Sequence, residues 1–212
     1  MSRINPLNRQ DVTELEPFLS TTEKRMGFLP NSQLIMAYKP RLLQAFSQLS
    51  QAVHDPANKT PRQLRALVAN MASRSAGCQY CVAHTAESAH KASVEDIKIA
   101  AVGQYETNAS FTDAERVALR FAQRAAAVPN AVTDEDFTAL REYYCDEEIV
   151  ELVSVIAYFG FLNRWNDTFA TELESSPLGF AKCVLSDTGW SAGKHASQNR
   201  SCEAATGKAG SE

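Results

Sequence analysis

The segment 77–84, which reads GCQYCVAH, constrains this chain more than any other stretch. Its two cysteines lie three positions apart, and a histidine follows the second by three more. On a helix, Cys78, Cys81 and His84 would lie along one side, with the two sulfurs close enough to bridge. The positive end of the helix dipole favours a thiolate, so the segment predicts a dithiol that cycles to a disulfide. Half of a metal site, or two buried cysteines, are the alternatives.

Length and composition predict a soluble globular protein. The chain has 212 residues, of which 44% are hydrophobic and 22% charged, with a formal net charge of −4. That balance gives no reason to expect nucleic acid or a membrane as a partner. The sequence shows neither an apolar signal core at its N-terminus nor an apolar run of about 18 residues, so we expect a cytoplasmic protein. In a reducing compartment a Cys-x-x-Cys pair is redox-active or metal-binding. A second Cys/His pair at zinc spacing is missing from the sequence, so we expect no metal and no cofactor.

The hydrophobic periodicity predicts an all-α fold. Apolar residues recur at helical spacing, and no stretch alternates with period two for long enough to be a strand. Capping-box patterns begin at Thr112 and Thr133, and Gly160 is a possible break in the last helix. The predicted helices span about residues 11–18, 32–38, 40–54, 60–74, 78–91, 93–101, 113–127, 134–144 and 147–174.

The chain divides into one helical domain, residues 1–180, and a tail, residues 181–212. The tail is rich in Gly, Ser, Ala and Lys and has little to bury, so we expect it to be disordered. His195 and Cys202 lie in this tail and are interpreted as incidental. His54, at the end of a predicted helix, is given a structural or surface role.

A reducing dithiol requires a lowered thiol pKa, a base and a second thiol that resolves the first intermediate. We take Cys81 as the attacking thiol and Cys78 as its resolving partner, although the reverse order is open. His84 is placed to exchange protons with Cys81. Glu87 is a candidate to orient this imidazole, as is Glu151 if the two helices pack together. Both carboxylates are also typical of a solvated helix surface.

A second cluster, residues 163–167, reads NRWND and is unusually polar for an apolar helix. Buried polar groups must be paired, so this cluster either lines a site beside the thiols or stabilises the helix. An ion pair between Arg164 and Asp167 would serve the second purpose. The candidate site-lining residues are Asn163, Arg164, Trp165 and Asn166.

Four stretches together resemble one protein family: 27–31 (GFLPN), 77–84, 111–116 (FTDAER) and 159–168 (FGFLNRWNDT). With these motifs the chain resembles the carboxymuconolactone decarboxylase and alkylhydroperoxidase D-like superfamily. The resemblance implies an all-α helical bundle that self-associates into dimers, trimers or hexamers. It also implies reduction of a hydroperoxide substrate by the dithiol, with electrons from a small thiol or a protein disulfide reductant. Decarboxylases of the superfamily lack the cysteine pair.

Two positions depart from the superfamily pattern. Redox-active members place a histidine four residues after the second cysteine, where this chain has Thr85, and a glutamate twelve residues before the first, where it has Ala66. His84 is displaced by about 100° around the helix from the expected position. We therefore expect a slow thiol-dependent hydroperoxide reductase of the alkylhydroperoxidase type. The alternatives are a small-molecule binding or assembly protein with vestigial thiols, and a decarboxylase or lyase of the same superfamily.

Overall fold

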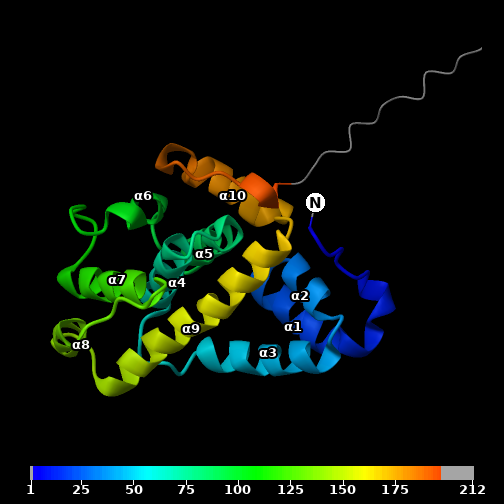
Figure 1. Cartoon of the computed structure of the whole chain (residues 1–212), viewed down its shortest axis with the longest axis horizontal. Helices are drawn as coiled ribbons and strands as arrows, with labels where there is room; N and C mark the ends of the chain where they lie inside the picture. The colour runs from blue at the N-terminus through cyan, green and yellow to red at the C-terminus, as the bar shows by residue number, and fades with distance from the viewer. Residues whose placement is uncertain (1, 197–212) are drawn as a thin grey trace, which may run out of the picture.

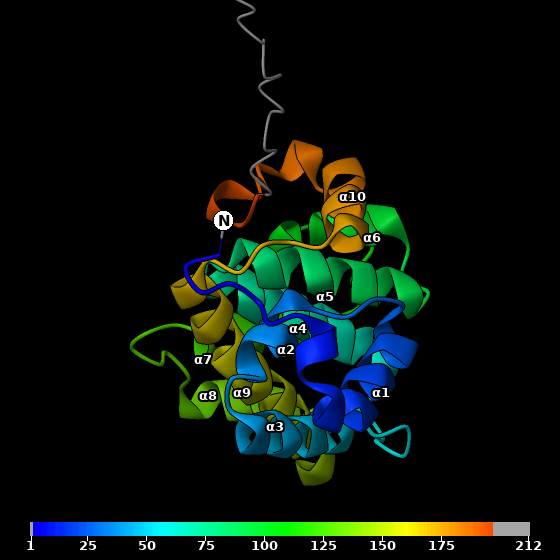
Figure 2. The same cartoon turned by 90° about the vertical axis from the view of Figure 1, so that its right-hand side faces the viewer.

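The computed structural model describes residues 2–196, and every regular element within them is helical. Figures 1 and 2 show the α-helices packed around the central pair α4 and α5, with the long helix α9 crossing them. The all-α prediction is thus confirmed, whereas self-association remains a prediction. The α-helices are α1 (Glu16–Met26), α2 (Asn31–Met36), α3 (Pro40–Val53), α4 (Arg62–Ser75), α5 (Gln79–Lys91), α6 (Asp96–Ala100), α7 (Asp113–Ala125), α8 (Asp134–Arg141), α9 (Asp146–Phe169) and α10 (Ser175–Val184).

The core forms where α4 packs against α5, α7 and α9. Leu67 and Val68 of α4 and Leu152 of α9 are buried there, as are the alanines Ala83 and Ala86 of α5. Small side chains on α5 let neighbouring helices approach it closely. The buried face of α5 therefore holds the start of the helix, with its cysteines, firmly inside the fold.

Local signals set several helix boundaries as predicted. Thr112 and Glu115 form a capping box at α7, and Thr133 and Asp136 form another at α8. The long helix α9 runs through Gly160 without a break and ends at Phe169, because the left-handed φ of 48° at Ala170 stops it short of the predicted residue 174.

The first helix differs from its prediction. A helix was expected over 11–18 with Pro17 near its end, but two short 3₁₀ turns, Arg9–Asp11 and Thr13–Leu15, lead instead into α1. Pro17 lies in the first turn of α1, where its missing N–H has no partner to lose. Gly27, with φ of 85°, ends the helix. Similarly, Glu95 and not the expected Ser93 precedes α6.

Residues 181–196, expected to belong to a disordered tail, instead form the end of α10 and two 3₁₀ turns, Ser186–Thr188 and Gly193–His195. The indole N–H of Trp190 donates to the Gln79 carbonyl at 3.2 Å, so this segment is fastened to the first turn of α5. In Figure 2, α10 lies above α5. Residues 197–212, including Cys202, lie outside the described part of the chain.

Within residues 2–196, none of the helices combines the length and the apolar character that a membrane crossing would require.

Candidate functional site

The two thiols lie at the start of α5. Gly77, with φ of 75°, makes the turn out of α4, Cys78 precedes the first helical residue, and Cys81 lies in the first turn. Both thiols are free, with exposed fractions of 0% for Cys78 and 2% for Cys81. Cys81 lines a cavity of about 660 Å³, while Cys78 is not among the lining residues. The two sulfurs therefore have different surroundings, one facing the cavity and one behind it.

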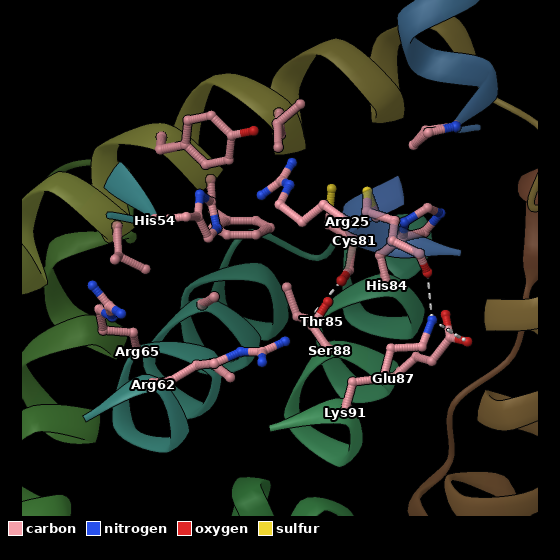
Figure 3. Close-up of a pocket in the computed structure, with 18 of the residues that line it drawn as sticks. Arg25, His54, Arg62, Arg65, Cys81, His84, Thr85, Glu87, Ser88 and Lys91 are labelled. Carbon is pink, nitrogen blue, oxygen red and sulfur yellow. Dashed lines mark hydrogen bonds and ion pairs between the residues drawn. The ribbon is translucent and has the colours of Figure 1, made fainter. Parts of the chain in front are cut away.

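The wall of the cavity is aromatic on several sides and carries a group of cations. Figure 3 shows Arg25, Arg62 and Arg65 around the space that Cys81 and His84 line. Among the described residues, no carboxylate lies within ion-pair distance of these three arginines. The aromatic lining residues are Phe28, Phe46, Tyr80, Tyr158 and Phe159.

The surroundings of the two thiols shift their pKa values in opposite directions. Burial raises the pKa of Cys81 well above its usual value. A hydrogen bond from Cys81 lowers the pKa of Cys78, which also lies next to backbone N–H groups of the helix start. Of the two thiols, Cys78 is therefore the one that ionises more readily, whereas activation had been expected at Cys81.

His84 lies on the cavity wall and is paired with a carboxylate that the sequence analysis missed. Its Nε2 donates to Glu174 Oε2 at 2.7 Å. Glu174 Oε1 accepts from the Tyr80 hydroxyl at 2.9 Å and from the Asn31 backbone N–H at 2.5 Å. Burial would raise the pKa of Glu174, but the charge and hydrogen bond of His84, with that of Asn31, hold it below its usual value. Glu174 thereby ties α2 and α5 to the segment between α9 and α10.

The two carboxylates predicted to orient His84 are engaged elsewhere. Glu87 is buried on the cavity wall but binds Ser176 Oγ and, at 2.9 Å, Lys91 Nζ. Glu151 accepts hydrogen bonds from the backbone N–H groups of Lys59 and Thr60 at 2.9 and 2.8 Å, which stabilises the segment that leads into α4. The predicted hydrogen bonds from His84 to these two carboxylates do not form, because each carboxylate binds other partners, although Glu87 does line the cavity.

The polar cluster 163–167 divides between the site and the helix. Asn166 lines the cavity, and its Nδ2 donates to Cys81 Sγ at 3.6 Å. Asn163 is buried without a hydrogen-bond partner among the described residues. Arg164 is exposed, and the predicted ion pair with Asp167 does not form.

Trp165, the remaining candidate from this cluster, stacks on Phe161 at a ring-centroid distance of 5.7 Å and does not line the cavity. Asp167 pairs instead with Lys194 Nζ at 2.7 Å.

Two histidines that had been given minor roles lie close to the thiols or the cavity. His54 lines the cavity, and its Nδ1–H donates to the Ser50 carbonyl at 2.9 Å. The surrounding protein and the charge of Arg25 lower the pKa of His54 to about 4. His195 is buried behind the dithiol. Cys78 Sγ, a carboxylate oxygen of Asp167 and a ring nitrogen of His195 lie within 4.8 Å of one another, and the described residues offer no fourth ligand at that distance.

Comparison with known proteins identifies the family. The model of the carboxymuconolactone decarboxylase family matches residues 40–124. The crystal structure of the debrominase Bmp8 is 35% identical and covers 85% of this chain and 97% of its own, with a TM-score of 0.79. A second Bmp8 structure, of a cysteine-to-alanine variant in complex with 2,3,4-tribromopyrrole, has the same TM-score at 34% identity. The chain belongs to the carboxymuconolactone decarboxylase family.

Two further proteins are less similar to this chain. An uncharacterised peroxidase-related protein from Ralstonia eutropha JMP134 shares the fold at 22% identity, with a TM-score of 0.75 over 85% of this chain and 95% of its own. The uncharacterised protein YnjA of Escherichia coli K12 is 27% identical over 103 residues, which are 49% of this chain and 57% of YnjA.

In this chain the positions of the usual histidine and glutamate are Thr85 and Ala66, both on the cavity wall. The Thr85 hydroxyl donates to the Cys81 carbonyl at 2.7 Å, so it serves the helix backbone.

Proposed function

We propose that this protein is a dithiol reductase of small organic molecules, in which Cys81 attacks the substrate and Cys78 resolves the intermediate. One observation carries the proposal: Cys81 lines the cavity, while Cys78 lies behind it with a lowered pKa. The thiolate of Cys78 accepts the proton of Cys81, and the sulfur of Cys81 then becomes the nucleophile. The 660 Å³ cavity is far larger than hydrogen peroxide needs, which supports an organic substrate.

A brominated aromatic ring is the substrate class best supported, because the debrominase Bmp8 is similar over nearly its whole length. In the reaction we propose, the thiolate of Cys81 takes the bromine from ring carbon, and that carbon receives a proton from water. Cys78 then gives up the proton that it accepted and attacks the Cys81 sulfur, bromide leaves, and a disulfide forms. The two electrons that reduce the carbon–bromine bond thus come from the two sulfurs, and an external thiol reductant restores them.

The cavity wall fits such a substrate. Phe28, Tyr158 and Phe159 offer surfaces for an aromatic ring. Negative charge develops on the ring as bromine leaves, and Arg25 and Arg65 lie on the wall without a carboxylate partner in the described part of the chain. Guanidinium groups in a confined site stabilise such charge more strongly than water does.

An organic hydroperoxide is the second candidate, because its reduction needs the same two electrons from the same two sulfurs and also leaves a disulfide. Cys81 attacks the terminal oxygen, the alkoxide leaves and takes a proton, and Cys81 becomes a sulfenic acid. Cys78 then displaces hydroxide, which leaves as water after protonation. The superfamily resemblance and the donor from Asn166 to the Cys81 sulfur favour this candidate.

A direct comparison of the two substrates tests the proposal. The protein should carry Cys145→Ser, Cys183→Ser and Cys202→Ser, so that only the dithiol remains. With a thiol reductant present, we expect bromide release from 2,3,4-tribromopyrrole or loss of cumene hydroperoxide, and loss of either activity in Cys81→Ser. Turnover of one substrate alone assigns the class. Equal rates with and without Cys81 would contradict the proposal and favour a protein with vestigial thiols or a cysteine-independent lyase.

A further inference from the structure

His195 is a buried base that the proposed reaction has not used. It closes the 3₁₀ turn Gly193–His195, and its exposed fraction is 1%. The Leu173 backbone N–H donates to the His195 carbonyl at 2.9 Å, so the residue is held from the backbone as well. Together with Trp190, which is bonded to Gln79, it fixes the segment 190–195 against the start of α5. A titratable ring is thus placed behind the dithiol, on a segment with little other burial.

The tautomer of His195 follows from its hydrogen bond. Its Nδ1 lies 2.8 Å from the Thr171 carbonyl oxygen. A carbonyl only accepts, so Nδ1 carries the hydrogen and, in the neutral ring, Nε2 carries the lone pair. Burial lowers the pKa of His195, which keeps the ring neutral near pH 7. The ring is therefore able to accept a proton at Nε2.

The lone pair of His195 Nε2 lies near the carboxylate of Asp167 and the thiol of Cys78. Nε2 has no hydrogen-bond partner in the described part of the chain, and it lies 3.7 Å from Asp167 Oδ1. A ring nitrogen of His195 is within 4.8 Å of Cys78 Sγ. Since Cys78 has no exposed surface, its proton cannot pass directly to bulk water.

We propose that His195 is the proton acceptor of Cys78, with Asp167 stabilising the resulting imidazolium. The inference rests on the dithiol cycle proposed above. When Cys81 gives its proton to Cys78, the S–H bond of Cys78 next breaks towards His195 Nε2. The electron pair stays on the Cys78 sulfur, which attacks Cys81 and displaces bromide or hydroxide. The imidazolium then gives its proton to Asp167, whose side chain is 42% exposed, and from there the proton reaches the displaced hydroxide or solvent.

Every charged group that faces His195 is consistent with this role. Asp167 comes from α9, and Lys194 Nζ binds the other Asp167 oxygen at 2.7 Å, which offsets part of its charge. From α5, the ring of Tyr80 lies 5.8 Å from that of His195 between centroids. The Asp167 carboxylate stabilises the positive charge on the His195 ring during proton transfer. The charge of Lys194 weakens this stabilisation, so that the ring can release the proton afterwards.

The test measures how fast the disulfide forms, in the background that retains only Cys78 and Cys81. Diamide is the probe, because it oxidises dithiols directly, and the assay therefore does not require the natural substrate to be known. His195→Gln keeps a donor for the Thr171 carbonyl but removes the base. We expect disulfide formation to slow by about 100-fold at pH 6–7, as is usual when a general base is removed. At pH 9 and above, where the Cys78 thiol ionises without help from the imidazole, the difference should disappear.

Trp190→Phe is the matched control, because it loosens the same segment and keeps the base. Its rate should follow the pH profile of the unmodified sequence. Slowing of His195→Gln by the same factor at every pH, or equal slowing in Trp190→Phe, would assign His195 a structural role and overturn the inference. One equivalent of zinc bound by the protein and lost in His195→Gln would also overturn it. Failure of the proposed function would give a different result: the substrates would not be turned over, although diamide would still form the Cys78–Cys81 disulfide.

Discussion

Replacement of Glu174 by glutamine is the most informative perturbation of the site. The carboxylate accepts hydrogen bonds from Asn31 N–H, the Tyr80 hydroxyl and His84 Nε2 at 2.5, 2.9 and 2.7 Å. Hydrogen bonds to a charged acceptor contribute about 1.5–3 kcal/mol, and neutral ones about half as much. Glutamine keeps an oxygen for two of these donors and places an amide against His84. At the lower end of these ranges, the loss of charge in two bonds and of the whole third bond costs about 3 kcal/mol.

This cost should appear in thermal unfolding and in turnover. For a chain of about this length, 1 kcal/mol shifts Tm by about 2–4 °C, so Glu174→Gln should lower Tm by about 6–12 °C. It should also lower kcat/KM, because Glu174 holds His84 on the cavity wall. Glu87→Gln is the control, since the Glu87 side chain on α5 is buried to a similar extent but binds Lys91 and Ser176. If Glu87→Gln reduced Tm and kcat/KM as much as Glu174→Gln, the assignment of Glu174 as the partner of His84 would be wrong.

Three further predictions concern the turn, the cavity and pH. Gly77→Ala should lower the free energy of unfolding, measured by calorimetry, by about 1 kcal/mol, because the left-handed φ of 75° is strained for any residue with a side chain even though the space around it is open. Gly179→Ala in α10 should leave stability unchanged or raise it. Equal effects of the two substitutions would contradict this prediction. Arg65→Gln should raise KM for an anionic or bromoaromatic substrate and leave diamide oxidation of the thiols unchanged; an unaltered KM would exclude the arginine from binding. Tm should fall as pH drops from 7 to 4. His54, with its pKa lowered to about 4, and His195 are neutral in the folded chain but protonate near 6.5 in the unfolded chain, so the unfolded state binds more protons in this range. A flat or rising Tm would contradict these pKa shifts.

The sequence predicts the parts of this fold that local chemistry determines. The capping boxes at Thr112 and Thr133, the helix from Pro40 and the placement of the dithiol at a helix start all follow from neighbours within four residues. The first helix was misplaced because Pro17 was interpreted as a stop, whereas proline is equally suited to the first turn.

The partners of the thiols and of His84 could not be predicted in the same way. Glu174 lies 90 residues from His84 in the chain, and no spacing rule connects them. His195 was interpreted as incidental because its segment is small and polar, yet Trp190 and the backbone bond from Leu173 hold it in place. Asn166 was identified as a candidate because an amide in an apolar helix requires a partner, and it donates to the Cys81 sulfur.

The account depends on a reversible bond between the sulfurs of Cys78 and Cys81, opened and closed as a substrate in the cavity is reduced. The most direct measurement is a count of free thiols per chain, with peptide mass spectrometry, after one equivalent of substrate is added to the two-cysteine background. We predict that two thiols disappear together and that one peptide carries an internal Cys78–Cys81 disulfide. In Cys78→Ser, the oxidised state should instead remain on Cys81. Substrate turnover with both thiols still free, or a disulfide only between chains, would contradict the central claim.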